Sequence, residues 1–180
     1  MNAKYIKLLA VFCFLNLALL LCVSGQNISI RLTVVSGGTV NYNFNSLQKY
    51  ESGIEYLNWS NLQVFYNDTT DVGTPGTSIG WELRVKAGTI GIMSDGGGNP
   101  PLALESIEIE PTITFGGTVT TINLTDSWQT IVEGNGNLSI LENILISYRC
   151  GTDPDPIYSM LEKPPDYYFV DLEFKVFPRY

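Results

Sequence analysis

Apolar and polar residues alternate along most of this sequence, and this two-residue period constrains the fold more than any other feature. Such alternation is the pattern of a β-strand with one face in a hydrophobic core. The runs are short, and each ends at a turn cluster such as Ser36-Gly37-Gly38 or Asp153-Pro154-Asp155-Pro156. No long segment has the 3.6-residue period of an amphipathic helix. We therefore expect an all-β protein, an antiparallel β-sandwich of the Ig-like or pilin-like kind with about eight to ten short strands.

The pattern also predicts how some of these segments are arranged. Residues 28–34 and 40–44 alternate on either side of Gly37-Gly38, which predicts a hairpin. Between residues 46 and 60 the apolar positions are three or four apart, so a short helix is an alternative there, although Gly53 disfavours it.

Further strands are expected along the rest of the chain. One begins at Leu62, and a partner strand is expected over residues 119–124. Residues 168–176 form the clearest strand, with apolar residues on one face and acidic or basic residues on the other. The core should include the apolar face that comprises Trp81, Leu83 and Val85.

The N-terminal segment has the organisation of a secretory signal peptide. Lys4 and Lys7 precede an apolar run from Leu8 to Val23, and the small residues Ser24 and Gly25 follow. We expect cleavage after Gly25. Residues 1–25 would then be removed, and residues 26–180 would form a single β-sandwich domain in a secreted, extracellular or cell-surface protein.

Cys22 offers an alternative, because lipidated N-termini also join a short apolar stretch to a cysteine. Leu19, Leu20 and Leu21 precede it, whereas such a signal requires a small residue there, so ordinary cleavage is preferred. No integral membrane span is expected after cleavage, since a span needs about 20 consecutive apolar residues.

Charge and composition exclude several functions. The formal net charge is −8 and the sequence contains no histidine. Nucleic-acid binding normally requires a basic patch, so no nucleic-acid partner is expected. Histidine is the commonest general base and metal ligand, and no catalytic motif, metal site or cofactor is predicted. We expect a protein that is not an enzyme.

Acidic residues provide two weaker alternatives. Paired carboxylates can hydrolyse glycosides, but Glu108 and Glu110 share one strand face, which is typical of a solvated surface. Asp95 with Asn99, or Asp153 with Asp155, could supply calcium ligands. Neither pair has the spacing of a calcium loop, and the proline after each aspartate of the second pair indicates a rigid turn.

A single cysteine, Cys150, remains after signal cleavage. A half-buried free thiol that packs like a small hydrophobe at a strand end is the preferred interpretation. An intermolecular disulfide is the alternative. A catalytic thiol is disfavoured because no histidine is present to activate it.

Exposed aromatic residues are a further candidate for function. Trp59 lies in the polar stretch Asn58-Trp59-Ser60-Asn61, and Trp128 follows a turn, so either ring could stack on a glycan. Trp81 continues an apolar strand face and is therefore assigned to the core.

The alternating first and last segments resemble those of bacterial fimbrial or surface-fibre subunits. The residues that carry the resemblance are Ile28, Ile30, Leu32 and Val34 at the start and residues 168–180 at the end. In pilin families an N-terminal segment of this type completes the sheet of a neighbouring subunit, which is recognition by strand addition. The resemblance implies a structural or adhesive surface subunit that associates with itself or with other surface subunits.

Two alternatives to strand addition stay open. The first segment could be an ordinary strand that is paired inside its own sandwich. The whole protein could instead be a carbohydrate-binding module that uses exposed aromatic rings.

Overall fold

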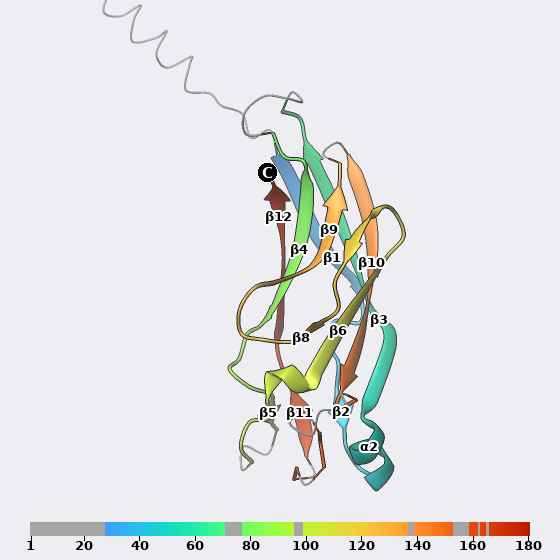
Figure 1. Cartoon of the computed structure of the whole chain (residues 1–180), viewed down its shortest axis with the longest axis vertical. Coiled ribbons are helices and arrows are strands. Elements are labelled where there is room, and N and C mark those ends of the chain that lie inside the picture. Colours follow the sequence, from blue (N-terminus) through green and yellow to red (C-terminus); the bar gives the residue numbers. More distant parts are fainter. Residues whose placement is uncertain are drawn as a thin grey trace, which may run out of the picture.

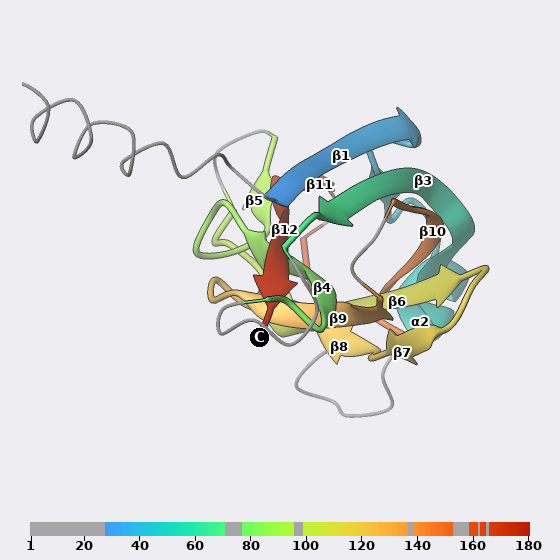
Figure 2. The ribbon, with the colours of Figure 1, turned by 90° about the horizontal axis from the view of Figure 1, so that it is seen from above.

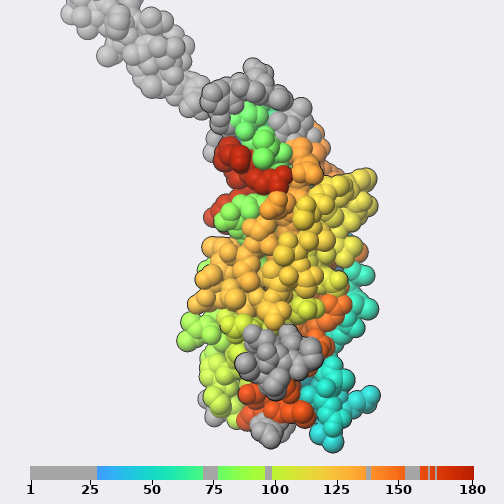
Figure 3. All heavy atoms as spheres, viewed as in Figure 1, coloured from blue at the N-terminus to red at the C-terminus, as the bar shows by residue number. Residues whose placement is uncertain are grey.

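The computed structural model shows an elongated β-protein with two large sheets and a small third sheet at one end (Figure 1). It describes residues 28–70, 77–95, 99–136, 139–152, 159–161, 163–164 and 166–180. Residues from β6 through β9, yellow to light orange in Figure 3, cover the middle of the face shown there.

The two large sheets are antiparallel and curve around a common interior (Figure 2). The five-stranded sheet has the order β1 (Ile28–Ser36), β3 (Ile54–Asp68), β10 (Ile140–Cys150), β6 (Ile107–Ile113) and β8 (Ile122–Asn123). The four-stranded sheet has the order β12 (Leu172–Arg179), β4 (Gly80–Ala87), β9 (Gln129–Asn135) and β7 (Gly117–Val119).

The small sheet has the order β2 (Tyr42–Asn43), β11 (Tyr167–Phe169) and β5 (Met93–Ser94). It lies at the end of the sandwich that also carries helix α2 (Leu47–Ser52), and the 3-10 turn η1 (Leu104–Ser106) precedes β6 (Figure 1). The expected all-β antiparallel sandwich is confirmed. The described residues form twelve strands, more than expected, because five of them have only two or three residues.

The core lies between the inner faces of the two large sheets. Trp81, Leu83 and Val85 of β4 are buried, as their alternation predicts. The Trp81 ring packs against the backbone of Gly134 on the paired strand β9, where an added Cβ would lie 2.0 Å from the indole. A glycine at this position therefore makes the close packing of the largest core residue possible.

The predicted hairpin between residues 28–34 and 40–44 is wrong. Strand β1 pairs with β3, and β2 pairs with β11 in the small sheet. Gly37 has a φ of +69°, and a Cβ there would lie 2.1 Å from the Trp59 carbonyl oxygen. The chain therefore turns tightly past β3 at this point and continues to the other end of the sandwich instead of folding back on β1.

Residues 46–60 contain both a helix and a strand. Ser46 caps α2 by accepting a hydrogen bond from the Lys49 amide, and Gly53, with a φ of +72°, ends the helix. Strand β3 then begins at Ile54, eight residues before the expected start at Leu62. The register of β3 against β10 shifts near Asn58, which has a φ of 50°, and this irregularity hides the two-residue period.

Two other strand predictions need correction. The expected strand over residues 119–124 is divided, because β7 belongs to the four-stranded sheet and β8 to the five-stranded sheet. The expected strand over residues 168–176 is also divided, since β11 pairs in the small sheet and β12 pairs with β4. In both cases the chain passes from one sheet to another without interrupting the apolar pattern.

Candidate functional site

Strand β1 forms one edge of the five-stranded sheet. It pairs with β3 from Ile28 opposite Asp68 to Ser36 opposite Asn61. No other strand among the described residues pairs with its second edge. An edge of this kind presents unpaired backbone N–H and C=O groups to its surroundings.

The apolar face of β1 points into the sandwich but is only partly covered. The pairing register places Ile28, Ile30, Leu32 and Val34 opposite Asp68, Tyr66, Val64 and Leu62 of β3, respectively. These residues of β3 also face inward. Ile28 and Leu32 pack against the core, whereas Ile30 is 37 % exposed and Val34 is 54 % exposed. The alternation therefore predicts the direction of the side chains correctly, but the expected burial of this face is wrong.

Val34, near the end of β1, borders a groove that residues 37–42 also line. Strands β1 and β12 are neighbours on this side of the sandwich, yet no backbone pairing joins them (Figure 2). The groove encloses about 380 Å³. Its lining includes Val34 on one side, Leu172 and Phe174 on the other, and Leu62, Ile107 and Tyr148 of the core. We call this feature the β1–β12 groove.

A buried hydroxyl group also belongs to this groove. Tyr42, which is 3 % exposed, lines it, and its hydroxyl has no hydrogen-bond partner among the described residues. Burial raises the pKa of Tyr42 well above its ordinary value, so the hydroxyl stays protonated and can donate. An unsatisfied buried hydroxyl is unfavourable.

Trp59 and Trp128 lie on different sheets, and no ring contact joins them. Trp59 of β3 is 44 % exposed, packs against Tyr56 with a centroid distance of 5.0 Å, and donates its indole N–H to the Thr39 carbonyl. Trp128 precedes β9, is 37 % exposed, and meets Phe177 of β12 edge to face. The two tryptophans therefore do not form a common platform.

Cys150 ends strand β10 inside the core and is only 1 % exposed. Burial raises the pKa of its thiol to about 12, so very little reactive thiolate exists near neutral pH. The thiol is therefore fully buried rather than half-buried as expected. The alternative, an intermolecular disulfide, stays untested and would require Cys150 to become accessible.

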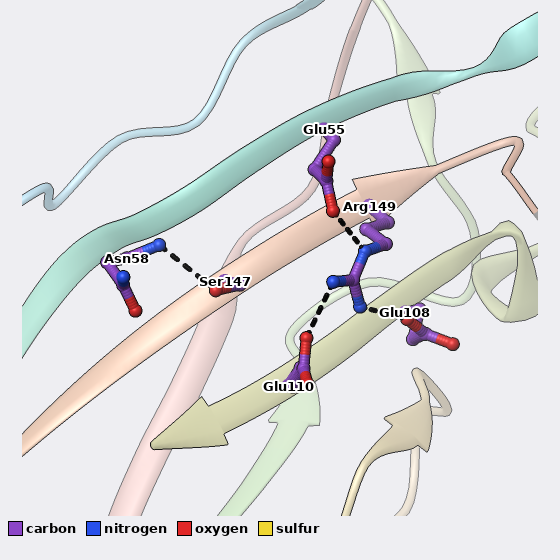
Figure 4. Close-up of polar contacts among 6 residues, drawn as sticks. All are labelled: Glu55, Asn58, Glu108, Glu110, Ser147 and Arg149. Atoms are coloured by element: carbon purple, nitrogen blue, oxygen red, sulfur yellow. Dashed lines mark hydrogen bonds and ion pairs between the residues drawn. The ribbon is translucent and has the colours of Figure 1, made fainter. Parts of the chain in front are cut away.

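Glu108 and Glu110 share the outer face of β6 and both contact Arg149 of β10 (Figure 4). The guanidinium also binds Glu55 of β3, with N–O distances of 2.6, 2.7 and 2.5 Å to Glu108, Glu110 and Glu55, respectively. Hydrogen bonds to Glu108 and Glu55 raise the pKa of Arg149, so it stays charged. The figure shows the arginine between its partners, an arrangement that joins three strands.

Of the two disfavoured pairs of calcium ligands, the structure describes only Asp95 and Asn99, which bond to adjacent residues at the start of β11. Asn99 donates a hydrogen bond of 3.0 Å to the Asp166 carboxylate, and Asp95 donates its backbone N–H to Tyr167. Asp153 and Asp155 lie outside the described residues. Where the structure describes side chains, no group of three or more His, Cys, Asp and Glu is arranged to hold a metal ion.

Some of these features have no signal in the sequence. Leu172 and Phe174 form the β12 side of the groove and are only partly buried. Their alternation predicts an inner face but does not show that this face is incompletely covered. Phe177 lies outside the predicted strand, and only the register of β12 against β4 shows that its ring faces outward.

No protein-family model and no curated protein matches this sequence. Among the residues that the structure describes, no helix has the length and apolar character needed to cross a membrane. Function is therefore inferred from the residues themselves.

Proposed function

We propose that this chain is an exported, non-enzymatic structural or adhesive surface subunit that associates by strand addition at β1. One observation carries the proposal: β1 is an edge strand whose inner-facing residues Ile30 and Val34 are exposed, and Val34 lines the β1–β12 groove. The lack of histidine and the pairing of Glu108 and Glu110 with Arg149 support a non-enzymatic role.

An added strand would gain two kinds of interaction at this edge. Its backbone would hydrogen-bond to the unpaired side of β1, and its side chains would enter the β1–β12 groove. Covering Ile30 and Val34, which are 37 % and 54 % exposed, would contribute about 1–3 kcal/mol in total. This contribution is small, so most of the affinity would come from the backbone and from Leu172 and Phe174.

Strand β1 lacks two of the usual protections against strand addition, although its register shifts at a bulge between Val34 and Ser36. Natural edge strands are blunted by proline, by charges that point inward, by bulges, or by a covering segment. Strand β1 contains no proline, and its single charged residue, Arg31, points to the outer face, where its guanidinium lies 5.9 Å from the Phe65 ring centroid.

A lysine placed on the inner face of β1 tests the proposal. Val34→Lys puts a charge at the groove, whereas the control Thr33→Lys puts the same charge on the outer face of the same strand. Sedimentation velocity of the mature protein at increasing concentration should show association that Val34→Lys abolishes and Thr33→Lys preserves. Equal effects of the two variants, or a strictly monomeric parent, would contradict strand addition in the groove.

Deleting residues 26–35 provides a second test. A truncated protein that stays folded but no longer associates with full-length copies would support an intermolecular role for this segment. Unfolding on deletion, together with a parent that is monomeric at high concentration, would instead identify β1 as an ordinary internal strand.

A further inference from the structure

The outer face of the four-stranded sheet concentrates basic residues on an acidic protein. Arg84 and Lys86 of β4 and Lys175 and Arg179 of β12 all point to this face, as their register with β9 and with one another requires. They are four of the eight basic residues in the described part of a chain whose net charge is −8. Glu82, Glu133 and Glu173 share this face, so these four cations exceed the three acids by one.

Three of these cations are paired with carboxylates on the same face. Arg84 binds Glu82, Arg179 binds Glu133, and Lys86 lies 3.2 Å from Glu173. Burial alone would raise the pKa of Glu82, but hydrogen bonds from Arg84 and Thr130 outweigh it and lower the pKa. These three acids are therefore already engaged with partners.

Lys175 is the remaining cation, and its position is electrostatically unfavourable. No carboxylate among the described residues forms an ion pair with it. It lies directly opposite Arg84 in the β12–β4 ladder, and like charges at opposite positions of an antiparallel pair destabilise the sheet. A negative group near Lys175 and Arg84 would remove this repulsion.

Two aromatic rings complete the surface. The Phe177 centroid lies 4.8 Å from the Arg84 guanidinium carbon and 5.0 Å from the Lys175 ammonium. Trp128 packs edge to face on Phe177 at a centroid distance of 6.1 Å and has the Lys86 ammonium 5.2 Å from its own centroid. Cations and exposed aromatic surface are therefore placed side by side.

We propose that this cationic aromatic surface, formed by Arg84, Lys86, Trp128, Lys175 and Phe177, binds an acidic polysaccharide that contains uronate residues. The apolar C–H face of a sugar ring packs against the electron-rich face of an indole. A uronate carboxylate at the same time pairs with Lys175 and Arg84 through charge-assisted hydrogen bonds. This binding site is independent of strand addition, because it lies on the outer face of the other sheet.

A sugar chain fits this surface better than an acidic protein does. A stable protein interface buries about 800 Å² on each partner and has an apolar centre. The surface here instead has one ring that is 37 % exposed, Trp128, beside charged groups that can bind hydroxyl and carboxylate groups. A second copy of this chain would also bring its own net charge of −8.

Binding of oligogalacturonate and of oligoalginate to the mature protein tests the inference, with fully methyl-esterified oligogalacturonate as the neutral probe. Isothermal titration calorimetry should show binding of at least one of the two acidic oligosaccharides. The methyl ester should not bind comparably. Lys175→Ala and Trp128→Ala should each weaken binding by about tenfold or more, since each removes a charge-assisted contact or the stacking ring.

Matched controls exclude general effects of charge or aromatic content. Lys163→Ala removes a cation elsewhere, and Trp59→Ala removes the exposed tryptophan of the other sheet, so neither should change the affinity. Circular dichroism should show that all four variants are folded.

Three results would overturn the inference. These are the absence of binding to both acidic oligosaccharides, equal binding of the methyl ester, and a loss of affinity in the control variants as large as in Lys175→Ala. A Lys175→Ala variant that changes self-association but not oligosaccharide binding would assign the surface to a protein partner instead.

Discussion

Asp68 ends strand β3 with its carboxylate completely buried. It accepts hydrogen bonds from the Ser78 hydroxyl at 2.5 Å, the Ser78 amide at 2.9 Å and the Thr70 amide at 2.9 Å. Tyr66 in turn donates its hydroxyl to Ser78 at 2.6 Å. These donors, the Ser78 hydroxyl first, outweigh burial and hold the pKa of Asp68 well below its ordinary value.

The lowered pKa of Asp68 predicts a loss of stability in acid. An unfolded aspartate titrates near pH 4, so the unfolded chain takes up this proton before the folded protein does. The stability that the ionised Asp68 contributes to the folded protein is complete above about pH 4. It is lost as the pH falls toward the pKa of Asp68 in the folded protein. Asp68→Asn should cost about 1–3 kcal/mol near neutral pH and flatten the acid dependence of urea denaturation. The exposed Asp126→Asn serves as the control, and an equal loss in both variants would contradict this role.

Cys150 should react only when the protein unfolds. Because the thiol is 1 % exposed and its pKa is raised to about 12, a chromogenic disulfide reagent should label it slowly in buffer and rapidly in denaturant. Cys150→Ser should leave the protein folded at a cost of about 1–3 kcal/mol, since it buries a hydroxyl in place of a thiol. Rapid labelling of the native protein, or a covalent dimer on non-reducing gels, would favour the intermolecular disulfide.

At the scale of elements, Arg149 links the three central strands of the five-stranded sheet. Its partners Glu55, Glu108 and Glu110 come from β3 and β6 on either side of β10 (Figure 4). The three glutamate side chains are 35–42 % exposed, so solvent and salt screen the attraction.

Replacing Arg149 should therefore have a modest, salt-dependent effect. Arg149→Ala leaves three carboxylates near one another and should lower the free energy of unfolding by about 1 kcal/mol at low ionic strength. The difference from the parent should shrink when salt is added, as thermal denaturation would show. Triple replacement of the glutamates by glutamine in the Arg149→Ala background should recover stability, and no recovery would mean that packing rather than charge is responsible.

The sequence predicts strand faces well but strand partners poorly. Trp81, Leu83 and Val85 are identified as core residues because their period reflects burial, a local property. Strand β1 pairs with residues 61–68 of β3, and this long-range pairing is not encoded in the period of either segment. The groove and the cationic aromatic surface depend on which strands become neighbours, so neither is visible in any one segment.

At the scale of the whole molecule, the net charge of −8 separates the two proposed activities. Copies of an acidic protein repel one another, so added salt should strengthen self-association through β1. Uronate binding at Lys175 depends on attraction between opposite charges, so added salt should weaken it. Sedimentation and calorimetry over the same salt series should show these opposite trends, and parallel trends would contradict this separation.

The two strands that border the β1–β12 groove also determine how the molecule would respond to tension. Ile28 of β1 and Arg179 of β12 lie at the same end of the sandwich, beside Asp68 and Gly80 of their partner strands (Figure 1). Pulling these ends apart would break the ladder hydrogen bonds one after another, like opening a zipper, since the bonds of an antiparallel ladder run across the strands. A strand seated in the groove and paired with both edges would hold the two ends together, so the tensile strength of a fibre built from such subunits would depend on its added strands.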